Sequence, residues 1–564
     1  MLFRKELLLG VAAFAAFTSP AFAQSASQVV PDSYAPVAQQ PGGPVVIPQD
    51  MPTQVPDGAE DLVVTLNGVR IEGAVADPAA VAALESQLLG RPVKVAAIFE
   101  AAHELERYFA ANGEALTRVV VPAQDLADGA ILRLVVVQGQ IEAVNTDALP
   151  RAVRRKVASY LAPLVGKPGV KIGQIERKLL LASDVPGLTM RSTLVPGSKP
   201  GMSVLAVEGD YRPLGVMLGF NNLQSDGLGR EAVSLGFDFN GNLGLGETIY
   251  LRASGDPSDG YFDKRPRNRV LAAGVVAPIG NDGLSLNIEG VDARTAGNVP
   301  INRPRFASHF QRLSTRLSYP FVLSRTTRLT GTVAFDVANE DITLIEPAQF
   351  GVSRDRLRVA RLGGDFATAF SGGGQMSAAM ELSQGLNIAG ARSAADATPT
   401  LPLSRAGADA DFTALNVSAG IDLPLAQHVA GRLRGSAQTS FGYALVNSES
   451  FGIAHGDAIS TLSQGLLQGD TGYALRGELQ FPFTVAEGDL FLAPYVFGAN
   501  GRVLLKQPSA LERRDTAAWA YGAGVRLAGN HGARWGLNAE YGAAEVDGIP
   551  GAPGRFSLSF QLSY

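Results

Sequence analysis

The chain has 564 residues, including 64 glycines, 33 prolines and no cysteine, and its formal net charge is −5. This length exceeds that of one ordinary domain, and the negative charge argues against nucleic acid as a partner. The lack of cysteine fits an oxidising compartment such as the periplasm, where a stray thiol is a liability.

The first 23 residues have the three parts of a secretory signal peptide. A positive start (Arg4 and Lys5) precedes an apolar core (residues 7–17) and an A-x-A cleavage site (residues 21–23). The alternative, a membrane anchor, needs a longer apolar run to cross a bilayer core of about 30 Å. We therefore expect cleavage before Gln24 and export from the cytoplasm.

Residues 24–58 are rich in proline, glutamine, valine and glycine, a composition that predicts a disordered linker. No later segment has 18 consecutive apolar residues. Any membrane-spanning part of the chain must therefore be a closed barrel, because only helices and closed barrels satisfy every backbone polar group in lipid.

Residues 59–138 predict a compact module with the order β-α-α-β-β. Strands are expected at 62–66, 116–121 and 131–137, and two amphipathic helices are expected between the first two of them. Residues 139–209 repeat this order, with strands near 141–144, 189–195 and 202–208. Two units of about 70–75 residues with one topology indicate an internal repeat.

From residue 210 to residue 564 the helical periodicity disappears and alternating apolar and polar residues take over. Sixteen candidate strands are separated by Gly, Asn and Asp turns; they are centred near residues 216, 235, 251, 273, 288, 314, 331, 361, 380, 416, 435, 477, 494, 522, 538 and 560. An arginine that faced lipid near the midplane would cost about 2–4 kcal/mol. The charged faces, with Arg316, Arg476 and Glu478, are therefore expected to line the lumen, although structural salt links between strands explain these residues equally well.

The final strand alternates strictly, with Phe560, Leu562 and Tyr564 on its apolar face. An aromatic residue after such a strand is typical of outer-membrane barrels and is expected to act as the assembly signal for the barrel-assembly machinery. A soluble sandwich or propeller would show the same alternation. The signal peptide, the aromatic C-terminus and the absence of cysteine favour a transmembrane β-barrel of 16 antiparallel strands, preceded by two periplasmic α+β modules.

This organisation resembles the two-partner secretion transporters (TpsB, ShlB/FhaC/HecB-like) of the Omp85 superfamily, whose modules are POTRA domains. The similar motifs occur in both modules and at the start of strand twelve: Val121-Pro122-Ala123-Gln124 with Asp128-Gly129, the stretch 179–187 ending in Pro-Gly, and residues 469–473 with Arg476 and Glu478-Leu479. The resemblance implies a translocator in the outer membrane, with its modules in the periplasm.

Two positions depart from the family pattern. In the family, the loop between strands eleven and twelve enters the barrel, and an arginine at its tip meets an aspartate in an F-x-D-x-G pattern on strand thirteen. Here the loop, about residues 441–470, has the tip Ile459-Ser460-Thr461-Leu462, and strand thirteen carries Phe497, Ala499 and Gly501. Ser460 and Ala499 replace the charged pair, and losing both charges avoids a lone buried one. We expect the loop to remain inside, held by apolar and hydroxyl contacts of Ile459, Thr461 and Leu462.

The resemblance implies that the protein receives an unfolded exoprotein, similar to an adhesin or haemolysin, and passes it to the cell surface without ATP. Outer-membrane lipids are a further implied partner. The family often has a plug helix before the first module, but the prolines of residues 24–58 predict no stable helix there.

Each module is expected to present a strand edge to which an extended peptide can add. The candidate cargo-binding residues of the first module lie on a strand (Arg118, Val119, Val120 and Val121) and on a helix face (Ile98 and Leu105). The alternative for Ile98 and Leu105 is a place in the module core.

No catalytic residue, cofactor or metal site is expected. The five histidines, at 103, 309, 428, 455 and 531, lack metal-ligand spacing, and no P-loop or nucleophile elbow is present. Two other functions stay open: an outer-membrane assembly or insertase factor of the same superfamily, and a passive porin. Two modules rather than a longer array favour secretion, and a porin needs no modules.

Overall fold

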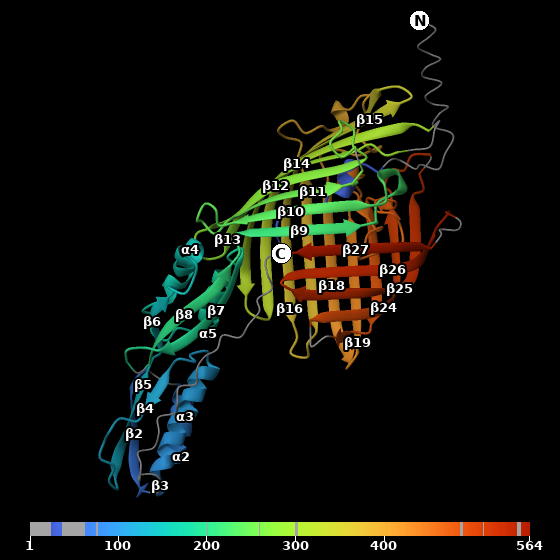
Figure 1. Ribbon diagram of the computed structural model, residues 1–564. Coiled ribbons are helices and arrows are strands. Elements are labelled where there is room, and N and C mark those ends of the chain that lie inside the picture. The colour runs from blue at the N-terminus through green and yellow to red at the C-terminus, as the bar shows by residue number, and fades with distance from the viewer. Residues whose placement is uncertain are drawn as a thin grey trace, which may run out of the picture.

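Two small modules extend in a row from one mouth of a large barrel (Figure 1). The computed structural model describes residues 24–36, 62–74, 77–199, 201–258, 260–298, 303–485, 489–510, 512–549 and 554–564. The predicted signal peptide and residues 37–58 of the predicted linker lie outside these ranges. None of the helices in the described ranges is long and apolar enough to cross a membrane.

The first module packs two helices against a three-stranded sheet of order β2-β5-β4, in which β2 and β5 are parallel. Asp77 caps the first helix by accepting a hydrogen bond from the Ala79 amide, and Pro78 starts its first turn. The elements are β1 (Val63–Val64), β2 (Leu66–Gly73), α2 (Pro78–Leu88), β3 (Val93–Lys94), α3 (Val95–Ala111), β4 (Arg118–Val120) and β5 (Ala130–Val137).

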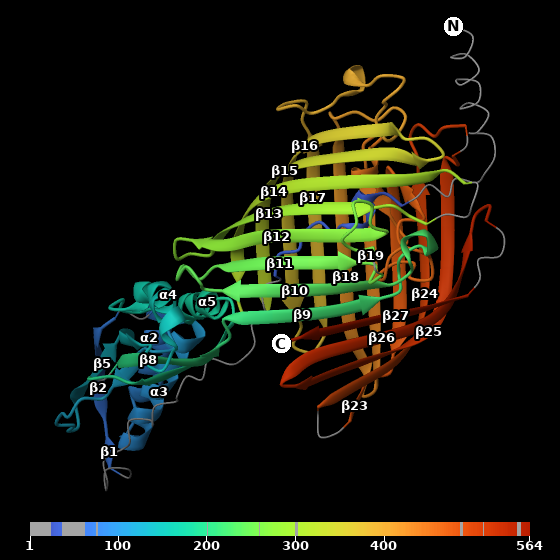
Figure 2. The same ribbon diagram turned by 45° about the horizontal axis from the view of Figure 1, so that its top comes forward.

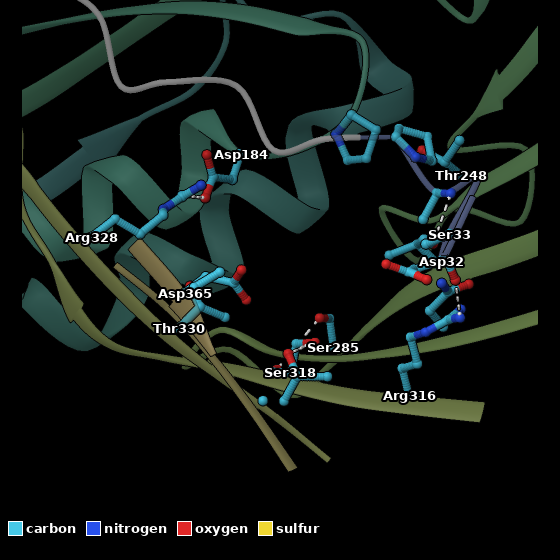
Figure 3. A pocket seen from close by; sticks show the side chains of 18 of the residues that line it. Asp32, Ser33, Asp184, Thr248, Ser285, Arg316, Ser318, Arg328, Thr330 and Asp365 are labelled. Carbon is cyan, nitrogen blue, oxygen red and sulfur yellow. Dashed lines mark hydrogen bonds and ion pairs between the residues drawn. The ribbon is translucent and has the colours of Figure 1, made fainter. Parts of the chain in front are cut away.

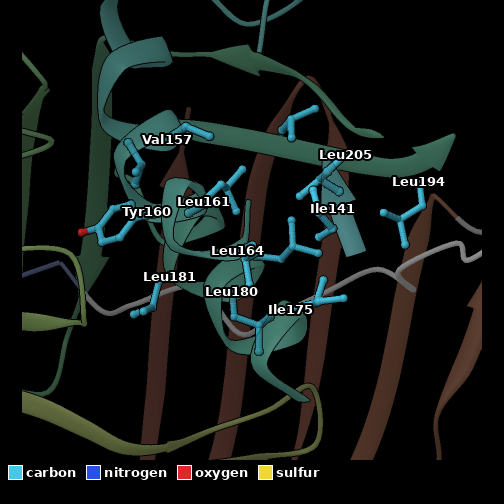
Figure 4. Packing of buried hydrophobic residues seen from close by; sticks show 14 of the residues in the cluster. Ile141, Val157, Tyr160, Leu161, Leu164, Ile175, Leu180, Leu181, Leu194 and Leu205 are labelled. Carbon is cyan, nitrogen blue, oxygen red and sulfur yellow. The ribbon is translucent and has the colours of Figure 1, made fainter. Parts of the chain in front are cut away.

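The second module has the same topology, with a sheet of order β6-β8-β7. Its apolar core joins the inner faces of both helices to the sheet, through residues such as Val157, Leu161, Ile175 and Leu205 (Figure 4). The elements are β6 (Gln140–Asn145), α4 (Arg151–Leu161), η2 (Ala162–Leu164), α5 (Ile172–Ser183), β7 (Leu188–Pro196) and β8 (Met202–Tyr211).

The barrel closes when its last strand pairs with its first, Ser563 opposite Met217. Sixteen antiparallel strands form it within the described residues, since β22 and β23 both pair with β24 and count as one; the predicted strand number is confirmed. The strands are β9 (Leu214–Asn221), β10 (Ala232–Asn240), β11 (Thr248–Gly255), β12 (Asn268–Ile279), β13 (Leu284–Thr295), β14 (Arg305–Leu323), β15 (Thr327–Glu346), β16 (Phe350–Ala369), β17 (Gln375–Gly385), β18 (Thr413–Ala426), β19 (Val429–Thr439), β22 (Thr471–Gln480), β23 (Phe483–Val485), β24 (Leu490–Leu504), β25 (Asp515–His531), β26 (Ala533–Val546) and β27 (Arg555–Ser563).

Short elements occupy the loops: η3 (Asp226–Leu228), η4 (Ala394–Asp396), η5 (Asn447–Glu449), β20 (Phe451–Gly452) and β21 (Gln468–Gly469). Side chains of the barrel strands alternate between the two faces. On β14, Leu313 and Leu317 are exposed on the outer face, whereas Ser314 is buried and Arg312 largely covered on the inner face. Around these residues the outer face is therefore apolar, and the inner face carries charged and hydroxyl side chains.

Helices α4 and α5 of the second module dock against two turns of the barrel. Lys178 donates hydrogen bonds to Asn281 O at 2.9 Å and to the Asp282 carboxylate at 3.0 Å, and Glu176 accepts from the backbone amide of Arg325 at 2.7 Å. These contacts mark the β12–β13 and β14–β15 turns as the periplasmic mouth.

The prediction of a disordered linker is wrong for residues 24–36. This N-terminal segment lies inside the barrel and contains one 3-10 turn, η1 (Ala26–Val29), visible as a short blue segment in Figure 2. Several of its backbone amides and carbonyls are bonded to side chains of the barrel wall, so its order comes from tertiary contacts that composition does not report.

Candidate functional site

The loop between β19 and β22 folds into the lumen. Ile459 is fully buried, and Ser460, Thr461 and Leu462 are nearly so. Ile459 and Leu462 pack in one apolar cluster with the inner faces of β24, β25 and β26. Gly501 on β24 makes room for the loop, because a Cβ there would lie 2.9 Å from Ile453 Cδ1 and 3.3 Å from Ile459 Cδ1.

Ser460, at the loop tip, is bonded to a buried ion pair of the wall. Its hydroxyl donates to the carboxylate of Glu540 on β26 and accepts from Nη1 of Arg476 on β22 at 2.8 Å. Arg476 Nη2 lies 2.5 Å from Glu540 Oε2, and both side chains are 2% exposed. The wall, not the loop, thus supplies the cation at the contact.

Arg476 lies directly opposite Ala499 in the β22–β24 ladder. Its guanidinium lies 3.9 Å from the centre of the Phe497 ring, and its Nε donates to Glu478 at 2.7 Å. Glu478 in turn accepts two hydrogen bonds from Arg526. The fold thus brings the tip, the strand-thirteen positions and two of the predicted lumen residues into one cluster.

One part of the expectation for this loop is wrong. Thr461 was expected to hold the loop through its hydroxyl, but Oγ1 of Thr461 is buried without a hydrogen-bond partner among the described residues. The hydroxyl group of Ser460 holds the loop instead. Sequence reasoning also missed Glu540 and Tyr495, whose hydroxyl donates to Glu540 at 2.8 Å. The sequence indicates only that Glu540 is a charged residue on the inner face of its strand, and this placement does not reveal its partner.

The base of the loop has two further ionic anchors. Asp470 is fully buried; it pairs with Arg405 and accepts from the amides of Leu445 and Lys506 at 2.8 and 2.7 Å. Arg361 on β16 pairs with Glu449 in η5 at 2.8 Å. The loop is therefore fastened at its tip and at its base.

The N-terminal segment (residues 24–36) crosses the lumen along β13, β14 and β15. The Ala26 amide donates to Ser308 at 3.0 Å, and the Ser27 amide donates to Glu340 at 3.1 Å. Farther along, the Tyr34 amide donates to Glu289 at 2.7 Å. The segment thus runs from the far end of the barrel toward the periplasmic mouth.

Arg316, predicted to line the lumen, contacts this segment: it donates to Asp32 O at 2.5 Å and to Glu289 at 3.4 Å. The segment also reaches the inward loop, where Gln28 Nε2 donates to Gln468 Oε1 at 2.6 Å. The two obstructions of the lumen are therefore in contact with each other.

Beside these elements, a cavity of about 1460 Å³ opens toward the periplasmic mouth (Figure 3). Its wall carries hydroxyl groups and nearly balanced charges, so no single sign of charge dominates it. The charged residues are Arg212, Arg312, Arg316, Arg328, Arg361 and Arg534, and Asp32, Asp184, Asp238, Asp336, Asp365, Glu381 and Glu449.

The candidate cargo residues of the first module fall into two groups. Ile98, Leu105 and Val119 are at most 3% exposed in the module core, where the helix face packs against the sheet. For Ile98 and Leu105 this is the alternative stated above, and none of the three side chains is open to a cargo peptide. Val120 and Val121 are partly exposed at the sheet edge, and Arg118 lies beside them on the short strand β4.

The C-terminal residues lie at the closing seam. Phe560 and Leu562 of β27 stand opposite Phe220 and Leu218 of β9, and the exposed Tyr564 ring lies 5.1 Å from the guanidinium of Arg212. Among the described residues, no group of three or more histidine, aspartate and glutamate side chains is arranged to hold a metal ion.

Comparisons with known proteins agree with this architecture. Residues 201–527 match the family model of the haemolysin secretion/activation protein ShlB/FhaC/HecB, and residues 64–139 match the ShlB-type POTRA domain. No curated protein matches the chain. Among solved structures, CdiB from Escherichia coli is similar with a TM-score of 0.70 and 16% identity over 91% of this chain and 92% of that one. CdiB from Acinetobacter baumannii gives 0.60 and 14% over 99% and 97%.

Proposed function

The chain belongs to the ShlB/FhaC/HecB family of haemolysin secretion/activation proteins and is an outer-membrane translocator of two-partner secretion, and from this premise we propose how it moves its cargo. An unfolded exoprotein, similar to an adhesin or haemolysin, binds the periplasmic modules, enters the barrel mouth and leaves at the cell surface. The observation that carries the route is the polar, charge-balanced cavity at the periplasmic mouth.

Transit requires the lumen to be cleared. The inward loop and the N-terminal segment both obstruct it, and both are held by noncovalent contacts, namely hydrogen bonds, ion pairs and apolar packing. Such contacts exchange for water at modest net cost, so an arriving chain can displace them one at a time. The lumen is therefore closed in the resting state and open during transport.

The energy for transport comes from the cargo. The outer membrane has neither ATP nor a maintained potential, so folding of the exoprotein outside the cell biases its direction of movement. A folded domain cannot return through a lumen that admits only an extended chain. Reception falls to the sheet edges of the modules, to which an extended strand can add.

Site-specific photo-crosslinking during export tests this route. A crosslinker at Val120, on the edge strand of the first module, and one at Thr330, on the wall of the cavity, are both expected to capture the same long secreted polypeptide. A crosslinker at Leu313 is the matched control, because this side chain is 51% exposed on the outer face. Capture at Leu313 but not at Thr330 contradicts passage through the lumen.

Crosslinking and conductance together separate the alternatives. Capture of many barrel precursors instead of one polypeptide would indicate an assembly or insertase factor. A passive porin predicts a steady, large conductance in a planar bilayer, whereas the obstructed lumen predicts low and intermittent conductance that rises when residues 24–36 are deleted.

A further inference from the structure

The outer face of the barrel has an apolar band. On β12–β16 this band ends, toward the cell surface, at a row of charged residues. The strand register places Leu317, Val333 and Leu362 side by side, and their exposed fractions of 42%, 59% and 59% mark them as lipid-facing. Eight residues farther toward the cell surface, on the same face, the ladder aligns a charged row: Arg269, Arg294, His309, Asp341 and Arg354.

Strand β14 connects this row to the periplasmic side of the barrel. Phe321, 65% exposed, is an aromatic residue near the periplasmic mouth, and His309 lies twelve residues away on the same strand. Twelve residues span about 40 Å along a strand, or about 30 Å along the membrane normal at a tilt of about 40°. Since the apolar band of such barrels is about 25 Å tall, the row lies just beyond it, at the level of the outer-leaflet headgroups.

The charges of the row are not balanced. With the adjacent row toward the membrane, which adds Asp292 and Arg356, four arginines face two carboxylates on this surface. Asp292 accepts from His309 at 2.6 Å and from Arg294 Nε at 3.2 Å, whereas Asp341 accepts from Arg354 Nε and Arg356, both at 2.6 Å. Both carboxylates are therefore already occupied.

The terminal nitrogens of Arg294 and Arg354 make no hydrogen bond to any described residue, and the two side chains are 34% and 47% exposed. Each guanidinium thus keeps two terminal nitrogens available to a ligand. Arginine binds phosphate oxygens through such paired donors.

A concave apolar surface lies directly below these charges. It is a hollow of about 710 Å³ on the outer face, where the small residues Ala253, Ala273 and Gly290 are surrounded by Leu251, Leu271 and Leu313. A Cβ built on Gly290 would touch nothing within 4 Å, so the space is open. A charged rim above an apolar hollow matches an amphiphile with a phosphorylated head and acyl chains.

We propose that the outer face of β12–β16 is a binding site for the phosphorylated glycolipid of the outer leaflet, with Arg294 and Arg354 on its phosphates and its acyl chains in the hollow around Gly290. The same strands hold the N-terminal segment on their inner face, through Ser308 of β14 and Glu340 of β15. A lipid bound outside would therefore stiffen the wall against which this obstruction rests.

Native mass spectrometry of the full-length protein in detergent tests the site, with three probes: bisphosphorylated lipid A, the same glycolipid without phosphates, and phosphatidylglycerol. The wild type is expected to retain bisphosphorylated lipid A, and the double variant Arg294→Ala/Arg354→Ala to bind it at least tenfold more weakly. The variant Gly290→Leu, which fills the hollow without touching the charges, is expected to weaken binding as well.

Arg502→Ala is the matched control. Arg502 lies on β24, on another part of the outer face, and it is paired with Asp515 by two hydrogen bonds, so its loss should not change binding. Equal binding by the double variant and the wild type overturns the proposal, as does equal retention of phosphatidylglycerol or of the dephosphorylated glycolipid. The charge-conserving variant Arg294→Lys/Arg354→Lys, with folding checked by heat-modifiable gel migration, distinguishes lost contacts from lost structure. Because the readout is lipid binding, the result is independent of translocation.

Discussion

Replacing Arg476 with alanine removes a cation that contacts both the tip of the inward loop and the barrel wall. In the closed state Glu540 is buried beneath the loop and paired with Arg476 at 2.5 Å. After the substitution its carboxylate stays buried without a cation. This free-energy cost exists only while the loop covers Glu540, because an open loop lets water hydrate the carboxylate.

The size of the effect follows from the burial. Removing one partner of a buried ion pair costs about 3–5 kcal/mol. Glu540 keeps the hydroxyl donors of Ser460 and Tyr495, so the lower end applies. At about 1.4 kcal/mol per factor of ten, a cost of about 3 kcal/mol raises the open-loop population about 100-fold.

The absence of cysteine in the chain makes this population measurable. A single Thr461→Cys substitution places a thiol at the buried tip, and it sacrifices no hydrogen bond, because the Thr461 hydroxyl has no partner among the described residues. When loop closure is faster than labelling, the maleimide reaction rate is proportional to the open population. We expect labelling to be about 100-fold faster in the Arg476→Ala background.

Two controls separate the loop contact from general loosening of the barrel. Arg526→Ala removes a cation from the same cluster that bonds Glu478 but no loop residue, so labelling should change less than about fivefold. Adding Glu540→Gln to Arg476→Ala removes the stranded charge and should restore most of the protection. Equal labelling rates in Arg476→Ala and Arg526→Ala, or no rescue by Glu540→Gln, would refute the reasoning.

Three further outcomes are expected. Glu289→Ala removes the acceptor of the Tyr34 amide and should loosen the N-terminal segment. The expected signs are faster proteolysis within residues 24–36 and more frequent channel openings. Unchanged conductance would contradict the role of the N-terminal segment as an obstruction. Hydrogen bonds from Tyr319 and Lys178 hold the pKa of Asp282 below its ordinary value, so docking of the second module should be constant above about pH 4 and weaken as the pH falls through that lowered pKa. Asp282→Asn should remove this acid dependence, measured by spin-label distances between module and barrel. Leu161→Ala in the core of the second module should destabilise it by about 2–5 kcal/mol in denaturant unfolding, and a cost below about 1 kcal/mol would show that the site is loosely packed.

The strand pattern was predictable because it is local. Alternation of period two tells which face of a strand each residue takes, and a charge on the lipid face is too costly to occur near the midplane. That argument predicted sixteen strands and assigned Arg316 and Arg476 to the lumen. Periodicity left two interpretations open for Ile98 and Leu105, because a helix stripe that packs in a core and one that binds a peptide have the same period. The structure places both residues in the core.

The sequence by itself determined the sixteen strands of the barrel and the two leading modules, since these depend on residues within one strand or helix. Only the tertiary structure decided that residues 24–36 lie in the lumen and that Ser460 is held by Arg476 and Glu540. Three amides of the N-terminal segment, those of Ala26, Ser27 and Tyr34, donate to Ser308, Glu340 and Glu289, hundreds of residues away. Arg476 and Glu540 are separated by β24 and β25 in the wall. Local periodicity fixes the direction of a side chain, but the partner of a buried charge depends on which distant strands the closed barrel places beside it.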